Sequence, residues 1–355
     1  MNKRLLLLNR KQFGYHSDTY YYCKYLNNKF DITYLCWDYG LKRPIVEKVN
    51  VKYVSRKGNK LVRYFRFLFA AISEVEKGYD ICFIKYFLGC SLLKLFNSKR
   101  NFIFDIRTAH TWDNPLKRNF LDTLLIFESL FFDKITVISK GLASRLKIPR
   151  KKVHILPLGA DSLSNKDKKI DKMKLIYVGT FKNRNIADTI VGFEKFYKKY
   201  RSKIEIEYKI VGSGTVKEEQ KLTTLARDIN IDNVIEFVGF VPHSDLGPYF
   251  DMNNIGVSFV PITKYFDKQP PTKTFEYALS GMPVIATNTT ENRKVISDTN
   301  GVIIPDTAEG FYEGLKVMFD RRVTYVSSDI RKTCTDFKWE NLVNKNLQVY
   351  LESLV

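Results

Sequence analysis

From Pro271 to Thr287 the chain reads Pro-Thr-Lys-Thr-Phe-Glu-Tyr-Ala-Leu-Ser-Gly-Met-Pro-Val-Ile-Ala-Thr. The pattern predicts a loop, a short helix, a Gly-Met-Pro turn and a buried strand, because proline is tolerated where a helix begins. Thr272 and Thr274 then fall in the first turn, whose backbone N–H groups lack partners within the helix and attract anions. Glu276 lies about one turn further on. The segment therefore offers N–H donors for a diphosphate and a carboxylate for sugar hydroxyls, which indicates nucleotide-sugar binding.

The length and charge of the chain set the broad class. It has 355 residues, of which 45% are hydrophobic, so two domains with packed cores are expected. The formal net charge is +20, from 58 Lys and Arg against 38 Asp and Glu. A basic surface favours an anionic partner, such as nucleic acid, anionic lipid or a phosphorylated substrate. The alternative is a surface of solvated lysines, and charge alone does not separate these options.

The cysteines and the N-terminus favour a cytoplasmic protein. The cysteines are odd in number and scattered without a C-x-x-C pair, so we expect neither a disulfide framework nor a metal site: Cys23, Cys36, Cys82, Cys90 and Cys334. The apolar run near the N-terminus is only four leucines long, too short for a signal peptide. No apolar run reaches the roughly 18–20 residues that cross a bilayer. Any membrane association is therefore expected to be peripheral, at the inner face of the cell membrane.

Short apolar runs alternate with helical stretches along the whole chain. Many runs are continuously apolar, which is typical of strands buried on both faces of a parallel sheet. The alternation predicts two doubly wound α/β domains. The expected strands are 5–8, 32–37, 51–54, 81–86, 102–106, 135–138 and 153–156 in the first half, and 175–179, 204–212, 234–240, 255–260, 284–287 and 302–305 in the second.

The domain boundary is expected near 159–174. Residues 161–174 are polar and highly charged, with little to bury, and indicate a linker. The expected domains are 1–160 and 175–338. Apolar residues recur at helical spacing after Trp339, so residues 339–355 are expected to form a final helix that packs back on the first domain.

Two basic stretches with apolar residues at helical spacing are candidates for contact with an anionic membrane. Residues 57–72 combine four cations with Leu61, Phe65, Leu68, Phe69 and Ile72. Residues 115–132 begin with Pro115 and carry Lys117 and Arg118 ahead of a leucine- and phenylalanine-rich run. The alternative for each stretch is a helix whose apolar side faces the core.

The motifs of the second half, in their order and spacing, resemble the donor-binding domain of GT-B glycosyltransferases. The resemblance is to the large retaining group called family 4 or glycosyl transferases group 1, and rests on residues 175–180, 210–214, 234–242 and 271–287. The first half resembles the acceptor domain through residues 104–107, 135–139 and 153–161. The resemblance implies two Rossmann-like domains facing a cleft, with the acceptor bound by residues 1–160 and the donor by residues 175–338.

The resemblance also implies roles for donor-side residues. The carboxylate matching Glu276 holds the ribose, and the N–H groups of Thr272, Lys273 and Thr274 hold the diphosphate. After Gly179, Lys182 and Arg184 are the candidate cations that neutralise the phosphates. The remaining family positions line the nucleotide through the main chain, and here they are Gly212, Gly214, Val238 and Gly239.

One position departs from the family pattern. The second family glutamate, eight residues before Glu276, is Lys268 here, and the adjacent Asp267 is the candidate substitute. This departure leaves open whether the acidic contact to the donor sugar is altered or absent.

The first half supplies fewer candidates. His110 matches a histidine that contacts the donor sugar, and Gly14 is expected to let the backbone approach the diphosphate. Asp18 is an acceptor-side candidate. The cases for His16, His154 and His243 are weaker.

These patterns support a glycosyltransferase that uses no cofactor and no metal, since no Asp-x-Asp motif is present. It would move a sugar from a nucleotide diphosphate, UDP favoured over GDP, to a lipid-linked or carbohydrate hydroxyl in surface polysaccharide assembly. The alternatives are a catalytically inactive relative, favoured by Lys268, an epimerase or phosphorylase of the same fold, and a basic nucleic-acid-binding protein. The aromatic residues lie mostly in core-like runs rather than spaced for base stacking, so no nucleic-acid partner is expected. The oligomeric state stays open.

Overall fold

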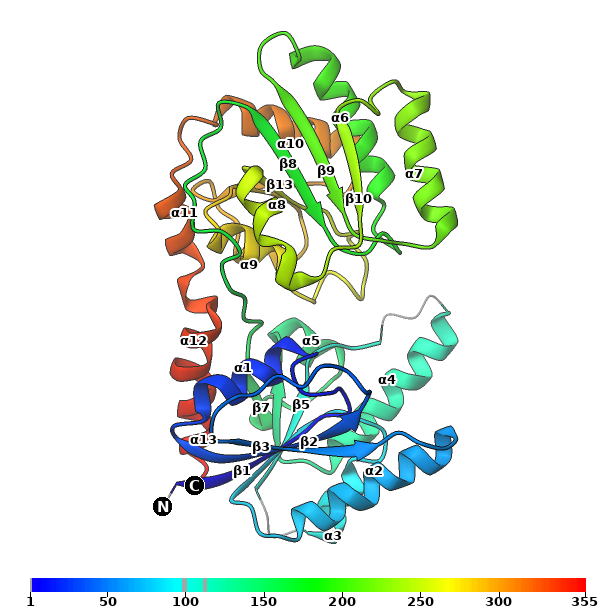
Figure 1. Ribbon diagram of the computed structural model, residues 1–355, viewed down its shortest axis with the longest axis vertical. Coiled ribbons are helices and arrows are strands. Elements are labelled where there is room, and N and C mark those ends of the chain that lie inside the picture. The colour runs from blue at the N-terminus through cyan, green and yellow to red at the C-terminus, as the bar shows by residue number, and fades with distance from the viewer. Residues whose placement is uncertain (1, 98–100, 111–113) are drawn as a thin grey trace. The chain divides into compact units, whose positions relative to one another are not determined.

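The computed structural model describes residues 2–97, 101–110 and 114–355. The chain divides into two compact units (Figure 1). Unit 1 combines the residues up to Leu158 with Trp339–Val355, and unit 2 is Gly159–Lys338. Each unit contains one parallel sheet with helices against it, so the prediction of two doubly wound α/β domains is confirmed.

The described part of unit 1 forms a seven-stranded sheet in the order β3-β2-β1-β4-β5-β6-β7. Each neighbouring pair of strands is parallel. Because β2 and β3 lie on one side of β1 and β4 to β7 on the other, the strand order reverses direction between β1 and β4. The strands are β1 (Lys3–Leu8), β2 (Phe30–Asp38), β3 (Val49–Ser55), β4 (Ile81–Lys85), β5 (Asn101–Ile106), β6 (Lys134–Val137) and β7 (Val153–Ile155).

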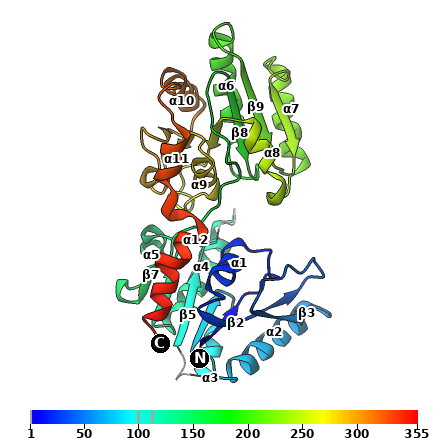
Figure 2. The same cartoon turned by 60° about the vertical axis from the view of Figure 1, so that its left-hand side comes forward.

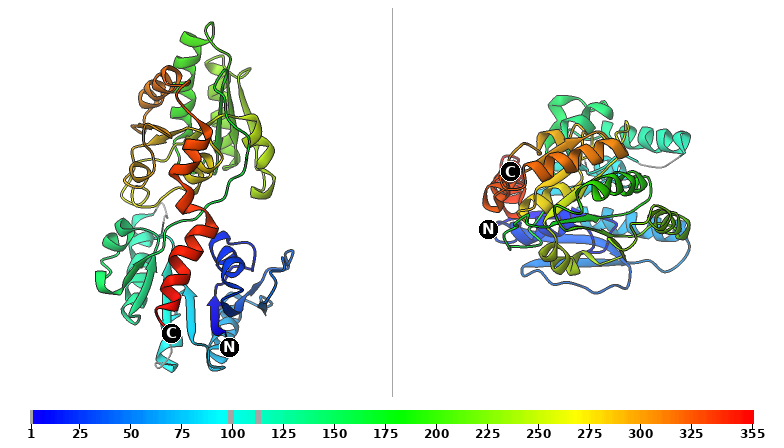
Figure 3. Two further views of the ribbon diagram at one scale, coloured as in Figure 1. Left: turned by 90° about the vertical axis from the view of Figure 1, so that its left-hand side faces the viewer. Right: turned by 90° about the horizontal axis from the view of Figure 1, so that it is seen from above.

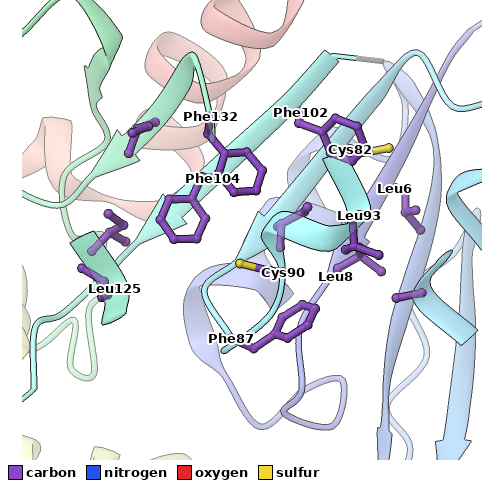
Figure 4. Packing of buried hydrophobic residues seen from close by; sticks show 14 of the residues in the cluster. Leu6, Leu8, Cys82, Phe87, Cys90, Leu93, Phe102, Phe104, Leu125 and Phe132 are labelled. Carbon is purple, nitrogen blue, oxygen red and sulfur yellow. The ribbon is translucent and has the colours of Figure 1, made fainter. Parts of the chain in front are cut away.

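Helices cover both faces of this sheet. Successive residues of β1 point to opposite faces, so Leu6 and Leu8 enter one hydrophobic cluster and Leu5 and Leu7 the other. The first cluster, shown in part in Figure 4, includes residues of α2 (Lys60–Val75), α3 (Ser91–Phe96), α4 (Pro115–Leu130) and α5 (Lys140–Arg145). The second includes residues of α1 (Ser17–Leu26) and the C-terminal segment.

The C-terminal segment completes unit 1. It contains α12 (Trp339–Leu342), a π-helical stretch η5 (Val343–Gln348) and α13 (Val349–Glu352), where the sequence predicted a regular helix. The buried Trp339 ring stacks on Tyr21 of α1, with 5.1 Å between ring centroids. Figures 2 and 3 show the segment running along unit 1, and α12 contacts α1. His154 bonds to Asn346 across 2.8 Å, which gives this histidine a structural role.

Unit 2 has a six-stranded sheet in its described residues, with the order β10-β9-β8-β11-β12-β13. Its strand order reverses direction between β8 and β11. The strands are β8 (Met173–Val178), β9 (Ile206–Val211), β10 (Ile235–Gly239), β11 (Ile255–Ser258), β12 (Val284–Thr287) and β13 (Gly301–Ile304). The helices are α6 (Ile186–Tyr200), α7 (Val216–Asp228), α8 (Gly247–Met252), α9 (Thr272–Leu279), α10 (Ala308–Asp320) and α11 (Ser327–Thr333).

Residues 161–174, expected to bury little, belong to unit 2 and contact the rest of it. Ser164, Lys168 and Ile170 are all buried. The backbone N–H of Ser164 donates to the hydroxyl of Ser280, and the Lys168 ammonium donates to the carbonyl of Phe250. Some polar groups of this stretch therefore bond to buried partners in unit 2 rather than to water, while its role as a linker stays a prediction.

We expect Trp339→Ala to lower the free energy of unfolding of unit 1 by about 3–5 kcal/mol, because it empties a buried site filled by a large ring. Urea unfolding followed by fluorescence and circular dichroism measures the loss. The matched control is Val349→Ala on the same segment, where the side chain is 57% exposed. An equal loss from both variants would contradict the packing described for this segment.

Candidate functional site

The N-terminus of α9 lies where the sheet of unit 2 reverses its strand order. In open α/β sheets, ligands bind beyond the carboxyl ends of the strands at such a switch point. The hydroxyl of Tyr277 on α9 accepts a hydrogen bond from the N–H of Val178 at the end of β8, across 2.9 Å. A side chain at Gly256 of β11 would place Cβ 2.3 Å from the Tyr277 ring, so glycine lets the helix lie close to the sheet. Tyr277 therefore fixes α9 against the two strands that flank the switch point.

Thr274 holds the first turn of α9 through its side chain. Its buried hydroxyl lies 2.7 Å from Ser258 Oγ and donates to Asn292 Oδ1 across 3.0 Å. Its backbone N–H, predicted as an anion donor, bonds to the carbonyl of Pro271 across 3.2 Å. Thr272 is exposed. The N–H groups of Thr272 and Lys273, at the first two positions of the helix, are therefore the ones that face outward along its axis.

Lys273 contributes more than the backbone N–H that the sequence predicted. Its ammonium is buried, has no hydrogen-bond partner among the residues that the structure describes, and lies 3.6 Å from the centroid of the Tyr177 ring. A side chain at Gly179 would place Cβ 3.0 Å from this ammonium. Burial, and then the nearby Arg184, hold the pKa of Lys273 well below its usual range. An unpaired buried cation is costly, and an anionic ligand would supply the missing partner.

The two cations predicted to follow Gly179 lie in different environments. Arg184 packs its guanidinium over the Phe266 ring, 4.1 Å from the centroid, and donates to the carbonyl of Asn183. Burial lowers the pKa of Arg184. Lys182 is exposed. Of the pair, Arg184 is the cation whose field reaches Lys273, so it is the better placed to act on the same anion.

The predicted glycines line the carboxyl ends of three adjacent strands. Gly212, with φ of +143°, would place a Cβ 1.8 Å from the carbonyl oxygen of Gly179, so the backbones of β8 and β9 approach closely only with glycine there. The Gly212 N–H donates to the carbonyl of Gly239 across 2.8 Å. Val238 lies where the pairing of β10 with β9 shifts register, and Gly214 precedes α7. The row presents main chain rather than side chains at this edge.

Glu276 forms an ion pair that the sequence reasoning missed. Its Oε1 lies 2.7 Å from Nε2 of His243, at the start of the turn η2 (His243–Asp245) that follows β10. The Glu276 side chain is 8% exposed and that of His243 is 62% exposed. The hydrogen bond to Glu276 raises the pKa of His243. His243 could have been proposed as a site residue from its position, because it directly follows the family-like section 234–242.

Asp267 is bound within its own loop region. Its Oδ1 accepts from the Thr290 N–H across 2.7 Å, and its Oδ2 accepts from the Thr290 hydroxyl across 2.8 Å and from Lys268 across 2.9 Å. Although burial opposes the shift, these bonds lower the pKa of Asp267. The carboxylate thus joins two loops, and its contact to a donor sugar stays a prediction.

Two of the candidates in unit 1, Gly14 and His110, lie in loops that follow strands, and the third, Asp18, lies in the first turn of α1. Gly14, with φ of +87°, turns against Pro44, where a Cβ would lie 2.2 Å from the proline ring. His110 bonds to Asp122 through both its N–H and its ring Nδ1, at 3.0 and 3.1 Å. Asp18 is buried among cations.

The sequence and the fold were compared with those of known proteins. Residues 172–320 match the family model described as glycosyl transferases group 1. The fold is similar to that of a glycosyltransferase from Rickettsia africae ESF-5, with a TM-score of 0.75 and 14% identity over 99% of both chains. It is similar to sucrose-phosphate synthase from Thermosynechococcus elongatus, with a TM-score of 0.75 and 16% identity over 99% of both chains.

A third similar structure is HepE from Anabaena in complex with UDP and glucose. Its TM-score is 0.74 and its identity 11%, over 99% of this chain and all of the other. The comparison with curated protein sequences finds no match. At these identities, the likeness to solved structures establishes the fold.

We expect the pKa of His243 to lie above its ordinary value of about 6.5 and to fall in Glu276→Gln, which removes the negative charge. Because the pKa is raised in the folded state, the stabilisation from this pair is complete below the ordinary pKa and is lost as pH rises through the raised one. NMR titration of the ring signals measures both values. Asp161→Asn is the comparison variant, since Asp161 raises the same pKa by a smaller effect. An unchanged His243 pKa in Glu276→Gln would rule out the pairing.

Proposed function

We propose that this chain transfers a sugar from a nucleotide-diphosphate donor to an acceptor hydroxyl, with retention of anomeric configuration. The match of residues 172–320 to the glycosyl transferases group 1 model and the GT-B fold support a glycosyltransferase. The observation that carries the proposal is the buried, unpaired ammonium of Lys273 at the start of α9, one turn before the carboxylate of Glu276. This spacing suits the diphosphate and the ribose of one nucleotide.

The donor diphosphate would bind at the N-terminus of α9. The N–H groups of Thr272 and Lys273 and the helix dipole favour negative charge there. The Lys273 ammonium would gain the partner that it lacks, and Arg184 would add a second positive charge. Two cations beside one diphosphate stabilise the charge that grows on the leaving group, and so we propose that the reaction needs no divalent metal.

The nucleoside would lie over the row of glycines at the ends of β8, β9 and β10. The main chain of Val238 and Gly239 would contact the base, and Glu276 would accept hydrogen bonds from the ribose hydroxyls. Those hydroxyls would replace His243, which holds the same carboxylate oxygen in the free protein. The similar structure of HepE contains UDP, which supports a UDP-sugar over a GDP-sugar.

In the proposed reaction, one carbon–oxygen bond at the anomeric carbon of the sugar is replaced by another. The bond from that carbon to the diphosphate oxygen breaks, the acceptor oxygen forms the new bond on the same face, and the hydroxyl proton passes to the departing diphosphate. Lys273 and Arg184 would lower the barrier by stabilising the leaving group rather than the ground state.

We propose a lipid-linked or oligosaccharide acceptor at the inner face of a cell membrane, in surface polysaccharide assembly. Helix α2 supports this proposal because it exposes Leu61, Phe65 and Phe69 on a helix rich in cations. Helix α4 also exposes large apolar side chains, namely Leu116, Phe120, Phe127 and Leu130. Such faces suit an anionic interface. Within the parts of the chain that the structure describes, no helix is long and apolar enough to cross a bilayer.

A thermal-shift panel of UDP, GDP, ADP, CMP and dTDP tests the donor site. One nucleotide at about 100 times its dissociation constant should stabilise the protein by about 2.7 kcal/mol. Glu276→Ala should remove that shift. Lys273→Met should weaken it while leaving the free protein no less stable, because the substitution removes a buried unpaired charge.

Glu313→Ala, on the outer face of α10, serves as the control and should respond like the wild type. Binding by Lys273→Met that equals the wild type would contradict the proposed diphosphate site. Binding without turnover of any donor would favour an inactive relative, in which Lys268 replaces the family carboxylate.

Liposome flotation tests the membrane surface. At low salt we expect recovery with phosphatidylglycerol vesicles and little with phosphatidylcholine vesicles, because a basic amphipathic face needs anionic lipid. The triple variant Leu61→Ser, Phe65→Ser, Phe69→Ser should lose most of this recovery, whereas Val349→Ser, an exposed site on α13, should not. Equal recovery with the two lipids would count against peripheral binding.

A further inference from the structure

The loop between β11 and α9, residues 259–271, borders the donor site of unit 2. Its Phe266 is buried, and the Arg184 guanidinium lies 4.1 Å from the centroid of the Phe266 ring. Arg184 is also the cation whose positive charge acts on Lys273 at the start of α9. Lys268 lies two residues after Phe266 on this loop. Lys268 therefore lies at the edge of the site whose cations are proposed to hold the diphosphate.

The ammonium of Lys268 is held between two loops. It donates to the hydroxyl of Thr290 across 2.9 Å and pairs with Asp267 Oδ2 across 2.9 Å. Thr290 follows β12, and its backbone N–H donates to Asp267 Oδ1 across 2.7 Å. The three residues thus join the loops that leave the carboxyl ends of β11 and β12, beside the switch point, where ligands bind in open α/β sheets.

Lys268 is more accessible to a ligand than its carboxylate partner. The Lys268 side chain is 37% exposed, whereas that of Asp267 is 20% exposed. Both oxygens of Asp267 already accept hydrogen bonds, from the N–H and the hydroxyl of Thr290 and from Lys268. Within this pair, the ammonium is therefore better placed than the carboxylate to meet a ligand.

The chemistry of the ammonium decides which ligand it suits. An ammonium donates hydrogen bonds and cannot accept them, so Lys268 cannot receive sugar hydroxyls as the glutamate of the family pattern would. A carboxylate is a stronger partner for it than a hydroxyl, because charge assists the hydrogen bond. Asp267 keeps its two bonds from Thr290, so Lys268 can serve a second carboxylate without leaving Asp267 unpaired. Lys273 and Arg184 would meet the charge of the diphosphate, which leaves Lys268 for a charge on the sugar.

We propose that Lys268 is a specificity-determining residue that selects a donor sugar with a carboxylate, a hexuronic acid, by pairing its ammonium with that carboxylate. Asp267 and Thr290 are positioning residues that hold the ammonium at the edge of the site. The inference rests on the proposed function, since the sugar belongs to the nucleotide that binds at α9. It differs from a purely structural role for Lys268, which would join the two loops without distinguishing one donor from another.

Isothermal titration calorimetry of the full-length protein, without an acceptor, tests the preference. The probes are two matched pairs, UDP-glucuronic acid with UDP-glucose and UDP-galacturonic acid with UDP-galactose, whose members differ only in a carboxylate against a hydroxymethyl group. In at least one pair the uronic acid should bind about tenfold more tightly, the effect of one charge-assisted hydrogen bond. If the nucleotide panel selects GDP instead, GDP-mannuronic acid with GDP-mannose is the matched pair.

Variants are compared by the ratio of the two dissociation constants within a pair, so that changes in affinity for the shared nucleotide cancel. Lys268→Gln removes the charge and should bring the two constants together, whereas Lys268→Arg keeps the charge and should retain the preference. Lys268→Glu restores the carboxylate of the family pattern and should reverse the preference toward the hexose. Lys264→Gln is the control, because it removes the same charge from an exposed position of the same loop, and it should keep the wild-type ratio.

The outcomes separate this inference from the proposed function. Equal affinity for both members of every pair, with the nucleotide itself bound, would leave the donor site standing and overturn the role of Lys268. A preference that persists in Lys268→Gln, or that Lys264→Gln loses equally, would also overturn it, since the selecting charge would then lie elsewhere. Absence of binding by every nucleotide would contradict the proposed function, and this inference with it. The wild-type comparison needs no variant, so the test survives if a substitution prevents folding.

Discussion

The hydrogen-bonded pairing of parallel strands is the constraint on which both candidate sites depend. In each unit the first strand lies inside the sheet, and the next strands are added on one side before the chain crosses to the other. The connections that leave the two strands at the switch point run in opposite directions. A crevice therefore forms at the carboxyl ends of β1 and β4, and another at those of β8 and β11, and side chains can enter it. Polar groups that the core would exclude gather there because the backbone has created a boundary with solvent.

The two units fill this edge with opposite electrostatic solutions. In unit 2, the Lys273 ammonium lies against Tyr177 and has no hydrogen-bond partner within the described parts of the chain, while Glu276 is paired with His243. In unit 1, Asp18 collects Lys85, Arg107 and the ring of His16, and its charge is fully matched. An unmatched cation favours an anionic ligand, whereas the carboxylate of Asp18 already has its cationic partners.

Sequence patterns predicted the architecture well because buried parallel strands have a local signature. Continuous apolar runs and the Gly-Met-Pro turn fixed the strands and the start of α9 to within a few residues. They failed where a side chain meets a partner far along the chain. His243 follows β10 and its hydrogen-bond partner Glu276 lies on α9, so no local sequence pattern predicts the pair.

Neither position in a helix nor polarity revealed which partner a group would bind. Thr274 was expected to offer its N–H to a ligand, but that group bonds to Pro271 and the hydroxyl ties the helix to β11. Lys168 lies in the stretch 161–174, expected to be a linker with little to bury, but its ammonium donates to the carbonyl of Phe250 inside unit 2. In both cases the residue binds a buried polar group of a neighbouring element that would otherwise lack a hydrogen-bond partner. Such groups become neighbours only when the chain has folded.

The return of the C-terminal segment to unit 1 has a consequence for the order in which the protein matures on the ribosome. Unit 2 is one continuous stretch that ends at Lys338, so its sheet can assemble as soon as that stretch has emerged. Unit 1 is interrupted by all of unit 2, and one face of its sheet is covered only in part, by α1, until Trp339, Leu347 and Leu351 have been synthesised. The half of the protein that is made first is therefore completed last, and its uncovered leucines and tyrosines are the surface that a chaperone would meet during synthesis.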